Sequence, residues 1–148
     1  MHIHALPDAA LARVRSTDRD VSEYPVVHVV AEGGEPLRCC LRNAEPGERL
    51  ILFGYEPPIG PSPYREIGAV FAHEAACAGP SADSYPPAWR GRRQVLRAYD
   101  ERGWIVDAVV HDGSAPEGAI AKLFADPRAV QLHSRNVAYG CFMFTVTR

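Results

Sequence analysis

The chain has 148 residues, of which 47% are hydrophobic and 23% charged, and its formal net charge is −2. This length and composition predict a single globular domain over residues 1–148 and exclude a disordered chain. A net charge near zero gives no general attraction to nucleic acid or to a membrane surface, and we expect neither as a partner. The N-terminal residues hold no apolar segment followed by a cleavage site, so we expect a cytoplasmic protein.

The first two-thirds of the chain predict one helix followed by strands. Residues 7–15 begin with Pro7 and Asp8, which favour the first turn of a helix. The segments that follow are rich in Val, Ile, Phe and Tyr and are separated by turn residues, which is typical of β-strands. The predicted strands are 25–31, 36–42, 49–56, 68–73, 94–99 and 104–111.

A second helix is predicted over residues 115–125, before two final strands at 129–134 and 138–147. Ser114 and Glu117 have the spacing of a capping box, and Ile120, Leu123 and Phe124 form an apolar stripe. The expected fold is therefore α+β. We expect one mainly antiparallel, twisted sheet or partly closed barrel of about seven to eight strands, with two packed helices.

The strand predicted at 36–42 carries two further expectations. Pro46-Gly47 suits a type II turn, so this strand and 49–56 are expected to form a hairpin. Adjacent residues of a strand point to opposite faces, so Cys39 and Cys40 are not expected to bind one ion together.

Several short blocks follow one another in a distinctive order. They are AEPGE at 44–48, SPYR at 62–65, LRAYD at 96–100, VDAVVHDG at 106–113, ADPR at 125–128, LHSRN at 132–136 and YGC at 139–141. With Pro36-Leu37-Arg38 before them, these blocks resemble the bacterial family catalogued as domain of unknown function 1203. The resemblance covers residues 36–148. It implies a stand-alone domain without assigning an activity, and it draws attention to Arg38, Tyr64, Arg65, His133, Asn136 and Cys141.

Two groups of these residues carry candidate chemistry. Cys141 and His133 are the catalytic candidates, because a thiol nucleophile needs a nearby base or cation and a hairpin of the last two strands brings them closer. Arg38 and Arg65 are the substrate-binding candidates, with Arg135 as a third cation and Tyr64 and Asn136 for orientation. The planar guanidinium fork suits carboxylates and phosphates.

The sequence predicts no metal and no cofactor. His73 and Cys77 have a spacing that gives half a metal site on a helix, but no further ligand has a convincing spacing. Two functions remain open. The first is an enzyme, or enzyme-like protein, acting on a small anionic metabolite. The alternative is a non-catalytic module that binds a ligand or a protein through the proline-rich loops at 56–65 and 78–93. The sequence does not define an oligomeric state.

Overall fold

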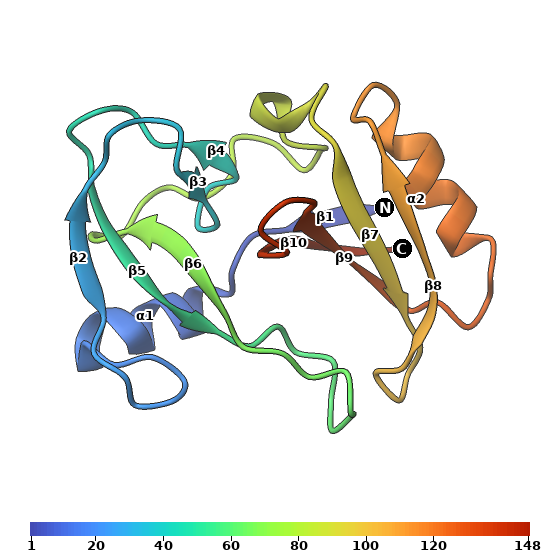
Figure 1. The fold of residues 1–148 in the computed structure, drawn as a ribbon, viewed down its shortest axis with the longest axis horizontal. Helices are drawn as coiled ribbons and strands as arrows, with labels where there is room; N and C mark the ends of the chain where they lie inside the picture. The colour runs from blue at the N-terminus through green and yellow to red at the C-terminus, as the bar shows by residue number, and fades with distance from the viewer.

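The computed structural model describes all 148 residues and has an α+β fold with two separate five-stranded sheets (Figure 1). One sheet lies in each half of the molecule, and each half carries one of the two α-helices (Figure 1). None of the helices has the length and apolar character needed to cross a membrane.

The first sheet has the strand order β1-β10-β9-β7-β8, and all of its neighbouring strands are antiparallel. Its strands are β1 (His2–His4), β7 (Gln94–Tyr99), β8 (Ile105–His111), β9 (Gln131–Asn136) and β10 (Phe142–Thr147). The last two predicted strands pair as a hairpin, as expected, with Phe142 opposite Arg135. Pairing of β1 with β10 brings the two chain termini close together (Figure 1).

The second sheet has the order β2-β5-β6-β3-β4. Its strands are β2 (Val27–Val30), β3 (Pro36–Leu37), β4 (Arg42–Asn43), β5 (Arg49–Tyr55) and β6 (Gly68–His73). All pairs are antiparallel except β3 and β6, which run parallel with Leu37 beside Phe71. This parallel pair places the end of β3 next to the end of β6, so the residues that follow β3 lie close to His73.

Each sheet has its own hydrophobic core. In α1 (Asp8–Thr17), Leu11 and Val14 join the core of the second sheet. In α2 (Pro116–Phe124), Ile120 and Leu123 are buried against the first sheet, while Phe124 is half-buried. The loop before β7 contains a 3₁₀ turn, η1 (Pro87–Trp89), whose Trp89 is fully buried in the same core.

The predicted capping box is wrong. Residue Ala115 precedes the first turn of α2, and no side chain caps it. Ser114 instead hydrogen-bonds to Asp112, with 2.7 Å between its Oγ and the Oδ1 of the aspartate. The short polar side chain completes the turn that ends β8, which competes with the capping role.

The prediction of one seven-to-eight-stranded sheet is also wrong, and the main local error falls at 36–42. Residues 38–41 form a turn between two-residue strands, and Leu41 has a left-handed φ of 55°. The expected hairpin with 49–56 does not form, because β6 and β3 lie between β5 and β4. Pro46-Gly47 does form a turn with a Gly47 φ of 89°, but the Gly47 amide donates to the carbonyl of Ala31.

Candidate functional site

A cavity between the two sheets collects three of the six residues singled out from the sequence. Arg38, Asn136 and Cys141 all line it. The cavity has a volume of about 270 Å³, and its remaining lining is mostly apolar: Pro36, Leu52, Ala69, Phe71 and Tyr139. The turn after β3 supplies Arg38, the last residue of β9 is Asn136, and the turn before β10 supplies Cys141.

Arg38 is the only charged residue of this cavity and is 3% exposed. Its Nε donates to the carbonyl of Phe142 at 2.8 Å and its Nη1 to the carbonyl of Pro36 at 2.5 Å. No carboxylate pairs with it, and its Nη2 makes no hydrogen bond within the protein. Burial lowers the pKa of Arg38 to about 10, so the side chain remains charged at neutral pH.

The polar groups opposite Arg38 belong to the β9–β10 turn. The Oδ1 of Asn136 accepts hydrogen bonds from the amides of Ala138 and Tyr139, at 2.9 and 3.0 Å, and so holds the turn in place. This leaves the Nδ2 of Asn136 as a donor. Cys141 is half-buried, and its Sγ makes one hydrogen bond, to the carbonyl of Tyr139 at 3.7 Å. The cavity therefore offers a cation, an amide donor and a thiol on an apolar wall.

The other three residues lie outside this cavity. Tyr64 is exposed and packs edge-on against Trp104, with 5.8 Å between ring centroids. Arg65 forms an ion pair with Glu56. Arg135, the third cation considered, is paired with Glu66 at 2.7 Å. Of the three arginines only Arg38 lines the cavity, and the other two each have a carboxylate partner.

His133 lies in the protein interior. It is 1% exposed and sits between the rings of Tyr99 and Phe142, with centroid distances of 4.7 and 5.3 Å. Neither ring nitrogen has a hydrogen-bond partner. Its register partner on β10 is Thr145, so the hairpin does not bring it opposite Cys141.

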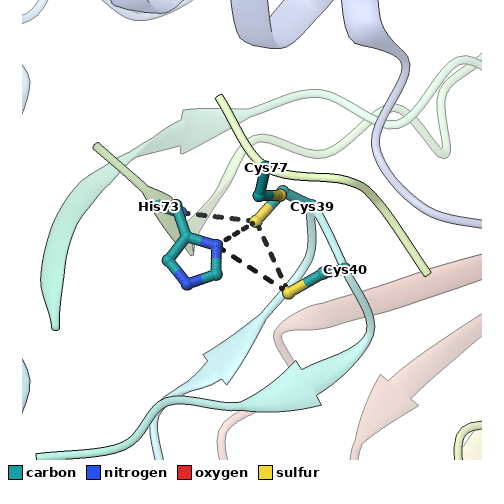
Figure 2. A group of neighbouring side chains, drawn as sticks. All are labelled: Cys39, Cys40, His73 and Cys77. Carbon is teal, nitrogen blue, oxygen red and sulfur yellow. Dashed lines mark hydrogen bonds between the residues drawn. The ribbon is translucent and has the colours of Figure 1, made fainter. Parts of the chain in front are cut away.

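A second group of reactive side chains was missed by the sequence reasoning. Cys39, Cys40, His73 and Cys77 place four donor atoms within 4.8 Å of one another (Figure 2). The Sγ atoms of Cys39 and Cys40 are 3.9 Å apart, and they lie 3.4 and 3.9 Å from the Nδ1 of His73. The statement that the adjacent cysteines point to opposite faces is wrong, because they occupy a turn and not a strand.

The pairing of β3 with β6 explains why these residues meet. Leu37 lies beside Phe71 in the parallel register, so the chain two residues further on places Cys39 beside His73. The amide of His73 donates to the Sγ of Cys39 at 3.3 Å. Cys77 then returns from the segment after β6. Only His73 and Cys77 carried a spacing signal in the sequence, because contact with Cys39 and Cys40 depends on the strand pairing.

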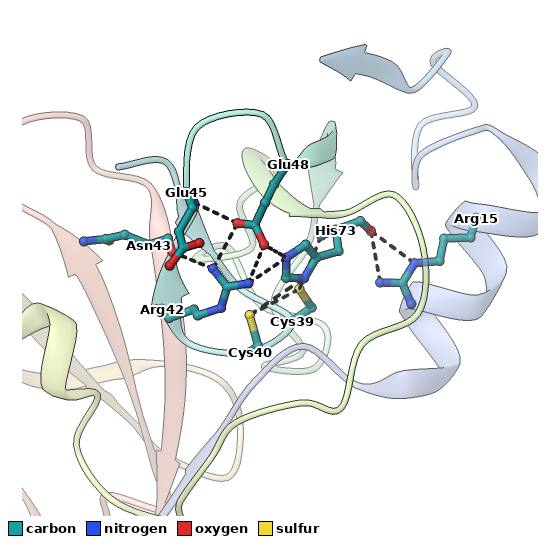
Figure 3. A network of polar contacts seen from close by, with 8 residues as sticks. All are labelled: Arg15, Cys39, Cys40, Arg42, Asn43, Glu45, Glu48 and His73. Carbon is teal, nitrogen blue, oxygen red and sulfur yellow. Dashed lines mark hydrogen bonds and ion pairs between the residues drawn. The ribbon is translucent and has the colours of Figure 1, made fainter. Parts of the chain in front are cut away.

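Charged residues surround the imidazole of His73 (Figure 3). Its Nε2 is 3.1 Å from the Oε1 of Glu48, which also accepts from Arg42 Nη2 at 2.6 Å. The hydrogen bond from Arg42, followed by the amide of Glu45, lowers the pKa of Glu48 to about 2. On the other side of the histidine, the guanidinium of Arg15 donates to the His73 carbonyl at 3.0 Å.

The two adjacent thiols differ in acidity. The hydrogen bond between them raises the pKa of Cys39 and lowers that of Cys40, and the charge of Arg42 adds to the lowering at Cys40. Burial raises the pKa of Cys77. The hydrogen bond thus favours ionisation of Cys40 over that of Cys39, and the Sγ of Cys40 lies 3.9 Å from the Nδ1 of His73.

The fold and its two polar clusters define an α+β protein with a buried arginine cavity and a thiol–imidazole cluster. The chain belongs to the family described as "Protein of unknown function (DUF1203)", whose model matches residues 34–148. All six residues that the resemblance singled out, and all four residues of the thiol–imidazole cluster, lie within the matched part. No curated protein and no solved structure matches the chain.

Proposed function

We propose that the protein binds a small molecule carrying a carboxylate and an apolar portion, in the cavity lined by Arg38. The observation that carries this proposal is the uncompensated charge of Arg38. Buried charges in proteins are normally paired, because an isolated charge away from water is costly. Arg38 has only backbone carbonyl partners, and one of its nitrogens remains free to bind an anion.

The shape and lining of the cavity support a small ligand. Guanidinium groups bind carboxylates through paired hydrogen bonds, which are stronger than neutral ones. Phe71, Leu52 and Ala69 offer apolar contact to the rest of such a molecule, and Asn136 adds a donor. A few polar groups on a mainly apolar wall are the usual composition of a small-molecule site.

The geometry favours binding over catalysis. A cysteine nucleophile is usually activated by an adjacent base, and the only hydrogen-bond contact of Cys141 Sγ is a backbone carbonyl. His133, the base suggested by the sequence, does not line the cavity. Cys141 is therefore proposed as part of the wall of the binding cavity.

Calorimetric titration with a panel of small aliphatic and aromatic carboxylates tests the proposal. At least one should bind the wild type. Arg38→Gln should weaken that binding by roughly 10- to 100-fold, equivalent to the 1.5–3 kcal/mol of a hydrogen bond to a charged group. Ala69→Leu should also weaken it, because Ala69 is on the exposed wall of the cavity and a larger side chain fills the space.

Arg65→Ala is the matched control. It removes an arginine that is bonded to Glu56 and does not line the cavity, so binding should be unchanged. Failure of every carboxylate to bind, or equal binding by wild type and Arg38→Gln, would show that Arg38 is a structural cation only.

A further inference from the structure

We propose that Cys39, Cys40, His73 and Cys77 form a zinc site that binds one Zn²⁺ ion. The site is distinct from the Arg38 cavity, which none of these four residues lines. Three thiols and one imidazole are a usual ligand set for structural zinc in proteins.

The distances between the donor atoms agree with this ligand geometry. Tetrahedral zinc, with Zn–S bonds of about 2.3 Å and Zn–N bonds of about 2.0 Å, keeps sulfur atoms about 3.8 Å apart and sulfur and nitrogen about 3.5 Å apart. In the protein the corresponding Sγ–Sγ distance is 3.9 Å, and the two Sγ–Nδ1 distances are 3.4 and 3.9 Å. The donors of Cys39, Cys40 and His73 thus have separations close to those that a single ion requires, and the Sγ of Cys77 lies within 4.8 Å of each of them.

The surroundings of His73 also suit a zinc ligand. A zinc-bound histidine usually donates its other ring N–H to a carboxylate, which fixes the tautomer and the ring orientation. The Nε2 of His73 faces Glu48 at 3.1 Å, and Arg42 holds Glu48 through two hydrogen bonds of 3.0 and 2.6 Å. The Nη2 of Arg42 also lies 3.1 Å from Nε2, and binding of an ion by Nδ1 would place the ring proton on Nε2, where Glu48 accepts it. The Nδ1 side of the ring faces the thiols of Cys39 and Cys40 (Figure 3).

Burial and charge also suit a closed structural site. Cys39 and Cys40 are 3% and 9% exposed, while Cys77 is exposed and borders an open surface pocket with His73 and Glu48. An ion therefore has a route to the buried thiols. Three thiolates around Zn²⁺ carry a net negative charge, which the cations of Arg42 and Arg15 partly balance.

The proposal is tested by titrating the reduced, metal-free protein with Co²⁺ and following thiolate charge-transfer and tetrahedral ligand-field absorption. We expect saturation at one equivalent and displacement of the cobalt by Zn²⁺. Cys40→Ser and Cys77→Ser should each weaken metal binding and reduce the charge-transfer absorption. Glu48→Gln should weaken binding by about 10- to 100-fold while keeping the tetrahedral spectrum, as expected for an outer partner of the histidine.

Cys141→Ser is the matched control, because Cys141 is the one cysteine outside the cluster, and it should bind cobalt as the wild type does. If Cys40→Ser does not fold, as judged by circular dichroism, the exposed position Cys77 still gives a folded variant. The proposal is overturned if the reduced wild type takes up no cobalt, if Cys77→Ser binds with unchanged affinity and spectrum, or if Cys141→Ser loses binding.

Discussion

At the residue scale, His133 shows how a polar side chain from a promising sequence block becomes part of a core. It lies on β9, which has β10 on one side and β7 on the other, and four consecutive residues of this strand are buried. The ring is tilted against that of Tyr99 and edge-on to that of Phe142, and it has no hydrogen-bond partner. Burial, with a smaller effect from the charges of Arg135 and Arg97, lowers the pKa of His133 to about 3.

This pKa predicts a specific loss of stability in acid. In the unfolded chain His133 takes up a proton as the pH falls through about 6.5, whereas the folded protein resists protonation down to about 3. Its contribution is therefore complete above pH 6.5 and is lost progressively below it. Between pH 7 and pH 5 the wild type should lose roughly 2 kcal/mol of unfolding free energy that His133→Phe does not lose. Urea denaturation of both proteins at several pH values measures this, and parallel curves would contradict it.

At the element scale, α2 is held by its apolar face and not by a side-chain cap. Ile120 and Leu123 are 2% and 1% exposed, while the first turn of the helix has no capping side chain. Packing against the first sheet therefore supplies most of the stability of this nine-residue helix, since helices this short are marginal alone.

Truncation of the packed face should be costly. Leu123→Ala should lower the unfolding free energy by roughly 2–5 kcal/mol, through lost burial and a residual cavity. Lys122→Ala is the control on the same helix, because Lys122 is exposed and should change stability by less than about 0.5 kcal/mol. Chemical denaturation measures both, and similar values for the two variants would show that α2 contributes little to the core.

The elements that the sequence predicted well are those with a strong local pattern. β6 and β7 have the predicted bounds, and β8 and β5 differ by one residue, because runs of β-branched and aromatic residues between turns specify strands locally. The three-residue β1 was not predicted, since it is ordered by pairing with β10 at the other end of the chain. The turn at 38–41 was missed because Arg38-Cys39-Cys40-Leu41 contains no glycine, proline or asparagine, the residues that usually mark a turn.

The candidate site residues show the same contrast between local sequence patterns and contacts with distant parts of the chain. Asn136 ends β9 and Cys141 directly precedes β10, and both line the cavity with Arg38. The pairing of Arg65 with Glu56 and the burial of His133 depend on neighbours that the sequence does not reveal. The thiol–imidazole cluster required both the missed turn and the parallel pairing of β3 with β6.

At the scale of the whole molecule, contacts between distant parts of the chain join the two sheets. Phe142 lies on β10 of the first sheet, but its side chain belongs to the core of the second. Its carbonyl also accepts from Arg38, which follows β3. The cavity therefore lies where the two halves meet, and its geometry depends on how they are held together.

The N-terminal segment contributes to both halves, although the family match begins only at residue 34. β1 is one of the two edge strands of the first sheet and β2 is one of the two edge strands of the second, and α1 between them packs into the second core. A chain trimmed to residues 34–148 would leave β10 and β5 with unpaired backbone N–H and C=O groups along one side. Exposed strand edges of this kind are templates for pairing with other chains. Both strands are also rich in apolar residues, with the sequences FMFTVT and RLILFGY.

The trimmed chain should therefore self-associate. Sedimentation velocity should show species that grow with concentration for residues 34–148 and not for the full chain, and identical profiles at matched concentrations would contradict this. By this reasoning, the segment outside the family match protects two sheet edges from aggregation, in addition to completing the core.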